Sequence, residues 1–266
     1  MVFELLFFDT VDSSLGRVDH GSFSQQTLME MVIEGIANKE KICGDANELK
    51  DIEEWKGLKV EDGEVVEINW RHSPYSGLTG SLCLEWLPSS VREFVVTWNR
   101  LTGTLDWASL PISMKRLDLG TNWFTGSIGL ERIPEAMVYL NVSENMFCGS
   151  LKLESLPKAM THFFAHYNKF SGSVDLTRLP AALVWLNLLN NQLSGSLDLT
   201  SLPSSMARLN VGNNSFSGTV DLSQLPQELE LLNLSYNQLS GEVFVSVALF
   251  SGVDVRNTKI IKRLIE

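Results

Sequence analysis

The sequence predicts an α/β solenoid that consists mostly of β structure, in which short coils of the chain stack on one another. The observation behind this prediction is that three residue types recur in register. Asn recurs every 23 residues, a Gly follows each Asn four residues later, and Pro keeps the same period. The positions are Asn99, Asn122, Asn145, Asn168, Asn191, Asn214 and Asn237; Gly103, Gly126, Gly149, Gly172, Gly195, Gly218 and Gly241; and Pro88, Pro111, Pro134, Pro157, Pro180, Pro203 and Pro226. We number the coils 1 to 7 from Asn99 to Asn237 and count positions from the Asn.

Apolar residues between these markers predict two short strands in each coil. Positions −5 and −3 are apolar throughout, as at Leu186 and Leu188, and a spacing of two indicates a strand with one buried face. Position +2 is always Leu or Phe, which predicts a stacked apolar spine. Positions +6 and +8, such as Val174 and Leu176, alternate again and suggest a second strand.

Each marker has a physical role in a stacked coil. The Asn side chain can bond the backbone of neighbouring turns, which a tight coil would otherwise bury without partners. Gly permits the turn that follows, and Pro stands where no ladder donor is needed. One coil cannot bury its own apolar side, so neighbouring coils must stack into a continuous core, about 4.8 Å apart.

The unit LxxLxLxxNxLSGSLDLxxLP, read at 183–203, resembles leucine-rich repeats. It is most similar to the plant-type form, and similar repeats with a Leu-Pro step occur in protozoan leucine-rich-repeat proteins. Seven full units cover 91–251, and a divergent first repeat precedes them at 65–90. The resemblance implies a right-handed arc with a parallel sheet on its concave surface, and a protein that serves in recognition.

Both ends of such a solenoid need caps. Residues 1–64 form an acidic N-terminal region, because residues 1–69 carry 16 acidic and 6 basic residues, and a helix-like pattern spans 22–43. Trp55 and Gly57 resemble the N-terminal cap of plant-type repeats, although Val60 stands where that cap has Cys. The C-terminal cap is expected at 252–266, as a short basic helix that begins at Asn257. The acidic cap could also dock a partner.

Composition excludes some classes of partner and location. A net charge of −11 argues against nucleic-acid binding. Three cysteines without paired spacing favour a reducing compartment, and the apolar start at residues 1–8 lacks the basic region of a signal peptide. We therefore expect an intracellular, cytoplasmic monomer without a membrane span. The alternative is a cell-surface or secreted protein with glycans at Asn141, Asn213 or Asn233.

The concave face should display positions −6, −4 and −2, and an unusual cluster interrupts its polar background on coils 3 to 5. Asn dominates position −4, but coil 4 has Phe164 there. Exposed aromatic and His side chains are typical of binding hot spots. The candidate partner-binding residues are Tyr139, His162, Phe164, His166, Tyr167, Trp185 and Trp98, and Trp123 adds aromatic surface nearby. Alternatively, these rings merely stack between coils and close the inner wall.

Sharper chemical roles are not supported by the spacing. His162 and His166 would lie roughly 13 Å apart on a strand, too far to share a metal ion. Met114, Met137, Met160 and Met206 recur at −8, which predicts core residues, and Cys148 is interpreted as a small buried residue. No nucleotide-binding or hydrolase motif occurs, so we expect no cofactor and no enzyme activity.

The sequence therefore predicts a non-catalytic module that binds a protein or peptide on its concave face. A surface or secreted recognition protein is the second hypothesis, and a structural subunit of a larger assembly is the third. Protonation of the His residues near pH 6.5 could make binding sensitive to pH.

Overall fold

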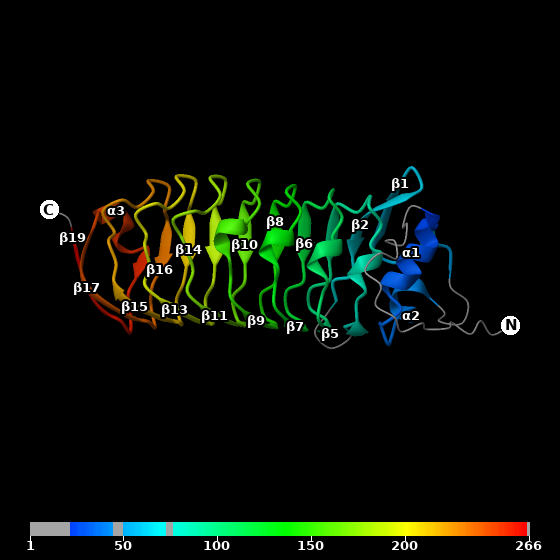
Figure 1. Ribbon diagram of the computed structural model, residues 1–266, viewed down its shortest axis with the longest axis horizontal. Coiled ribbons are helices and arrows are strands. Elements are labelled where there is room, and N and C mark those ends of the chain that lie inside the picture. The colour runs from blue at the N-terminus through cyan, green and yellow to red at the C-terminus, as the bar shows by residue number, and fades with distance from the viewer. Residues whose placement is uncertain (1–21, 45–49, 73–76, 265–266) are drawn as a thin grey trace, which may run out of the picture.

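The computed structural model describes residues 22–44, 50–72 and 77–264, which form an elongated stack of coils (Figure 1). The apolar run at residues 1–8 and Ile265 lie outside these ranges. Successive strands pair in parallel at equal positions of successive coils, as His162 does with Trp185. The chain thus has the mostly β solenoid fold that the 23-residue period predicts.

Two sheets run along the stack, and among the described residues one has ten strands and the other nine. The ten-stranded sheet holds the predicted first strand of each coil. In spatial order it consists of β1 (Leu58–Glu61), β2 (Glu64–Asn69), β4 (Glu93–Val95), β6 (Arg116–Asp118), β8 (Tyr139–Asn141), β10 (His162–Phe164), β12 (Trp185–Asn187), β14 (Arg208–Asn210), β16 (Leu231–Asn233) and β18 (Val253–Asp254).

The nine-stranded sheet corrects the prediction for the second strand. It consists of β3 (Thr79–Ser81), β5 (Arg100–Gly103), β7 (Trp123–Gly126), β9 (Met146–Gly149), β11 (Lys169–Gly172), β13 (Gln192–Gly195), β15 (Ser215–Thr219), β17 (Gln238–Val245) and β19 (Lys259–Leu264). These strands start directly after the Asn rather than at +6. The +6 and +8 side chains are buried in every coil. In coils 1 to 6 they follow the end of the strand, which lies at the marker Gly or one residue later, and in coil 7 strand β17 continues through both positions, Val243 and Val245, as predicted.

Short 3₁₀ helices lie between residues 52 and 155. They are η2 (Ile52–Glu54), η3 (Leu84–Trp86), η4 (Trp107–Ser109), η5 (Leu130–Arg132) and η6 (Leu153–Ser155). The first, η2, precedes β1 in the N-terminal cap, and η3 to η6 connect the two sheets. In coils 4 to 6 this connection is a turn rather than a 3₁₀ helix, and an Asp carboxylate accepts the backbone N–H two residues later, as Asp198 does from Thr200.

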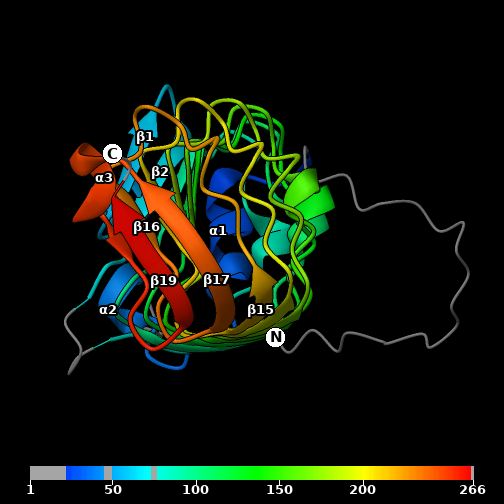
Figure 2. The same ribbon diagram turned by 90° about the vertical axis from the view of Figure 1, so that its left-hand side faces the viewer.

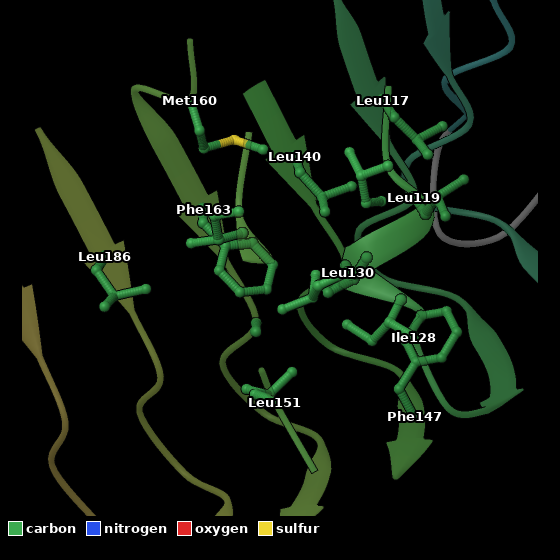
Figure 3. Packing of buried hydrophobic residues seen from close by; sticks show 14 of the residues in the cluster. Leu117, Leu119, Ile128, Leu130, Leu140, Phe147, Leu151, Met160, Phe163 and Leu186 are labelled. Atoms are coloured by element: carbon green, nitrogen blue, oxygen red, sulfur yellow. The ribbon is translucent and has the colours of Figure 1, made fainter. Parts of the chain in front are cut away.

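A continuous core fills the space between the sheets. Side chains from successive coils point into one interior, where Leu140, Phe163 and Leu186 follow one another along the stack (Figure 3). The +2 spine stacks as well, with ring centroids 6.2 Å apart for Phe124 and Phe147. The predicted Met column is part of this core, because Met114, Met137, Met160 and Met206 are completely buried.

The marker Asn side chains join each coil to the one before it. Asn145 accepts a hydrogen bond from the backbone N–H of Phe124, 3.0 Å away in the preceding coil. Its amide donates to the carbonyl of Leu119, also in the preceding coil, and to Val142 and Ser143 in its own coil. The same pattern recurs at Asn99, Asn122, Asn168, Asn191, Asn214 and Asn237.

The N-terminal end is covered by helices and a hairpin. Helix α1 (Gln25–Val32) begins at Ser24, whose hydroxyl accepts the N–H of Thr27, and buries Met29 and Val32 against the first coils. Helix α2 (Glu40–Cys43) follows. Strand β1 pairs with β2 in antiparallel orientation and so forms one edge of the ten-stranded sheet. Trp55 is buried beside this hairpin, 3% exposed.

The C-terminal end differs from the predicted basic helix. Residues 259–264 form strand β19, which pairs with β17 over six residues and faces the viewer in Figure 2. The only helix among the described residues of this end is α3 (Val247–Phe250). The reason is that Ile260 and Ile261 favour a strand and continue the register of the sheet. Ile260 is buried, whereas Ile261 and Leu264 are exposed.

Removal of one marker Asn should destabilise the protein strongly. Asn145→Ala leaves the N–H of Phe124 without a partner inside the stack and removes one of the two donors to the carbonyl of Leu119, which keeps the Asn122 amide. We therefore expect the free energy of unfolding to fall by about 1 to 3 kcal/mol. Urea denaturation measures this change. Gln192→Ala, at an exposed strand position, is the control and should change the value by less than about 0.5 kcal/mol. Equal effects of the two substitutions would contradict the proposed role of the Asn.

Candidate functional site

A row of stacked side chains crosses the middle of the ten-stranded sheet at position −6. Strand register places Arg116, Tyr139, His162, Trp185 and Arg208 beside one another in that order. The Arg116 guanidinium lies 3.8 Å from the Tyr139 ring centroid, and that of Arg208 lies 4.9 Å from Trp185. Two cations therefore bracket three rings, an arrangement that cation–π attraction favours.

Phe164 lies within this cluster rather than at its surface. It was expected to be exposed, but it is only 9% exposed. Its ring centroid is 4.8 Å from that of Trp185 and 5.6 Å from that of Tyr139, both in edge-on geometry. The larger −6 side chains of three coils cover it, so Phe164 acts first as a support for the rings around it.

His166 extends the cluster toward the loop edge of the sheet. Its ring contacts Phe164 and Tyr167, with centroids 6.3 and 5.8 Å apart. Burial lowers the pKa of His166, although Glu144 opposes this change. Burial and the nearby Arg116 lower the pKa of His162. Both imidazoles are thus neutral at pH 7, and their protonation requires a more acidic solution than the ordinary pKa of 6.5 implies.

A hollow of about 620 Å³ opens beside the cluster, toward the N-terminal end of the sheet. We call it the sheet groove. Its floor at position −2 carries only small side chains, Thr97, Gly120 and Ser143, whereas the next coil has His166 there. Small residues on three coils followed by a bulky one explain why the groove ends at the aromatic cluster.

One buried carboxylate organises the centre of the sheet groove. Asp118, 6% exposed, forms an ion pair with Arg116 at 3.1 Å and accepts a hydrogen bond from the Asn141 amide at 2.8 Å. The Tyr139 hydroxyl lies 3.5 Å from the same carboxylate. Burial and the charge of Asp118 raise the pKa of Tyr139, so this hydroxyl keeps its proton. The bonds hold Arg116 and Tyr139 in fixed positions.

The loop edge of the ten-stranded sheet carries exposed rings on an unusual backbone, and one of them, Trp98, lines the sheet groove. At position −1, Trp98 and Tyr167 have φ of 62° and 52°, the left-handed region that bulky residues rarely adopt. Their exposed fractions are 40% and 48%. Asn190 and Asn213 occupy the same position in later coils, and Asn suits this conformation better. Coils 1, 4 and 7, the last with Tyr236, thus carry large rings where a small polar residue would be easier to accommodate.

The structure brings most of the predicted site residues together. Ring contacts join Tyr139, His162, Phe164, His166, Tyr167 and Trp185, and Trp98 lines the groove beside them. Trp123 does not belong to this surface, because it lies in β7 of the other sheet. Cys148 is exposed in β9 rather than buried as predicted, because the alternation along the strand turns its side chain to the face opposite that of the buried Phe147.

The sequence prediction missed Arg116, Asp118 and Glu144, which line the sheet groove. The column assignment could have found the first two, because they occupy the same −6 and −4 columns as the predicted rings. Glu144 belongs to the −1 column, whose orientation depends on the left-handed backbone. Within the described ranges, no group of three His, Cys, Asp or Glu residues could hold a metal ion.

Comparison with known proteins identifies the class. The Leucine Rich Repeat family model matches residues 228–249. The chain matches no curated protein. Solved structures with a similar fold include the plant peptide hormone receptor RGFR1 in complex with RGF2 (19% identity, 70% of this chain and 35% of that chain, TM-score 0.52). They also include a pollen receptor kinase 3 (22%, 77% and 95%, 0.52) and a plant ice-binding protein (14%, 91% and 95%, 0.56).

The stacked 23-residue coils and the family match together show that the chain is a leucine-rich-repeat protein. It spans about a third (35%) of the hormone receptor chain, and at these identities the similarity to the solved structures concerns the fold alone. No helix within the described residues has the length and apolar character needed to cross a membrane.

The burial of Phe164 leads to a prediction about stability. Phe164→Ala should lower the free energy of unfolding by about 3 kcal/mol, because it leaves a cavity beneath Tyr139 and Trp185. Trp98→Asn is the matched control, and we expect a change within about 1 kcal/mol, since the lost ring contacts are offset by a residue that suits the left-handed backbone. Denaturant titration of both variants measures this. An unchanged free energy of unfolding in Phe164→Ala would show that this ring does not support Tyr139 and Trp185.

Proposed function

We propose that this protein is a non-catalytic recognition module that binds a protein or peptide segment in the sheet groove. The proposal rests on one observation, that an open groove lies directly beside a cluster of fixed aromatic rings on one face of the sheet. Large rigid rings give contact area at a small loss of side-chain entropy, which is why they dominate binding hot spots. The concave placement expected from the repeat is part of the same proposal.

The backbone at the loop edge supports this assignment. Trp98 and Tyr167 stand in a left-handed conformation that disfavours large side chains, and both remain largely exposed. A residue that is unfavourable for folding and contributes little to the core is more easily explained by binding than by stability. Phe164, by contrast, contributes to binding indirectly, by holding Tyr139 and Trp185 in place.

Location is proposed to be extracellular, which was the alternative to the cytoplasmic expectation. The plant peptide hormone receptor in the comparison was solved in complex with RGF2, and this agrees with recognition outside the cell. The three glycan acceptor sequences are not equivalent in the folded chain. Asn141 and Asn233 lie within strands and accept hydrogen bonds from Ser143 and Ser235, whereas Asn213 is exposed.

Selection from a random seven-residue peptide library tests the binding function. Peptides that the protein selects should bind Trp98→Asn at least about 10-fold more weakly, because Trp98 lines the groove. Trp123→Ala is the matched control, since this exposed Trp belongs to the other sheet, and affinity should be unchanged. Fluorescence anisotropy with labelled peptides gives the affinities. Peptides that bind both variants as well as the wild type would exclude the sheet groove.

Expression through a eukaryotic secretory pathway tests the proposed location. We expect folded, secreted protein with a glycan at Asn213, because this side chain is exposed, whereas Asn141 and Asn233 are half-buried within strands of the sheet. Mass spectrometry after enzymatic removal of glycans identifies the modified Asn. Asn213→Gln should then abolish glycosylation. A folded protein that carries its glycan at Asn141 or Asn233 would contradict the structural argument.

A further inference from the structure

Two side chains that line the sheet groove each hold a buried polar atom that has no hydrogen-bond partner among the described residues. The two atoms are the hydroxyl oxygen of Thr97, a residue only 4% exposed, and Nδ1 of His166. Buried polar atoms in folded proteins almost always have a partner, and the exceptions require an explanation. A ligand that supplies the missing partners is one such explanation.

The positions of these two atoms define the size of that ligand. Thr97 and His166 occupy position −2 of coils 1 and 4, which lie about 14 Å apart along the stack at ~4.8 Å per coil. Gly120 and Ser143 lie between them and leave the floor low. An extended peptide advances ~3.3 Å per residue, so about four residues span this distance. A peptide backbone also offers N–H and C=O groups, which suit a hydroxyl and an imidazole nitrogen.

The loop edge of the groove indicates a basic side chain on this peptide. Glu144 is exposed at position −1, and its carboxylate accepts a hydrogen bond from the Thr121 hydroxyl at 3.2 Å. Trp98 stands at the same position two coils earlier. An ammonium or guanidinium group above Thr121 would therefore have a ring on one side and a carboxylate on the other, a combination that attracts cations.

The charges around the groove agree with this chemistry. Arg116 and Asp118 neutralise each other as an ion pair. The remaining charged lining residues are Arg71, which follows β2 at the N-terminal end, and the acidic Glu93 and Glu144. The whole chain carries a net charge of −11, which attracts a basic partner at long range.

We propose that the sheet groove binds a short extended peptide segment that carries a basic side chain. Its backbone bonds the Thr97 hydroxyl and the His166 imidazole, and its Lys or Arg lies between Trp98 and Glu144. This inference rests on the proposed binding function and adds the chemical class of the partner.

Parallel selections from the random seven-residue library test the basic side chain. Against the wild type and the control Glu131→Gln, which changes an exposed residue outside the groove, selected peptides should contain Lys or Arg at one preferred position. Against Glu144→Gln this preference should disappear. Peptides that depend on Trp98 but show no basic preference would overturn this inference and leave the binding function standing. Failure to select any groove-dependent peptide would overturn both.

The orphan hydroxyl gives a second, independent readout. Thr97→Val keeps the shape of the side chain and removes only an unpartnered oxygen, so the denaturation midpoint should stay the same or rise. Affinity for the selected peptides should fall about 3- to 10-fold, the effect of one lost hydrogen bond. Thr102→Val on the other sheet is the control and should leave affinity unchanged. Unchanged affinity of Thr97→Val would show that the ligand does not bond this hydroxyl.

Discussion

The hydrogen bonds of the marker Asn side chains are the constraint on which the rest of the structure depends. A coil of 23 residues turns too tightly to pair all its backbone groups within itself. Each Asn supplies an acceptor and a donor to the preceding coil, as Asn145 does for Phe124 and Leu119. Stacking therefore satisfies polar groups and buries apolar ones in the same step. The register of both sheets follows from this coupling.

That register turns the face of the ten-stranded sheet into a set of columns. Residues 23 positions apart become direct neighbours, so Arg116, Tyr139, His162, Trp185 and Arg208 form a row although they span 93 residues of sequence. The size of the side chains in each column then determines where the surface is hollow and where it is raised. Small residues at −2 open the sheet groove, and His166 and the rings around Phe164 close it. Local sequence alone thus creates a site without altering the backbone.

Periodicity allowed most of the fold to be predicted, because it reports which positions must be buried in every coil. It failed where the period ends or where backbone conformation decides. The basic C-terminal segment lacks the repeat, and its Ile260 and Ile261 join a strand instead of a helix. For the site, the period identified Phe164 as an exception to the Asn column at −4. It did not predict the burial of this ring, which depends on its contacts with Tyr139 and Trp185. An unpartnered atom such as the Thr97 hydroxyl is visible only in three dimensions.

The two ends of the stack differ in the elements that pack against the terminal coil. At the N-terminal end, α1 and the β1–β2 hairpin close the core, whereas within the described part of the chain strand β19 pairs with β17 alone. In a one-dimensional array, each coil is stabilised by its nearest neighbours, so unravelling starts where a neighbour is missing. Loss of the terminal coils would have to pass coils 7 and 6 before it reached coil 5, whose Trp185 and Asn187 line the sheet groove. The groove thus lies in the part of the array that opens last, and a fraying end leaves its geometry intact.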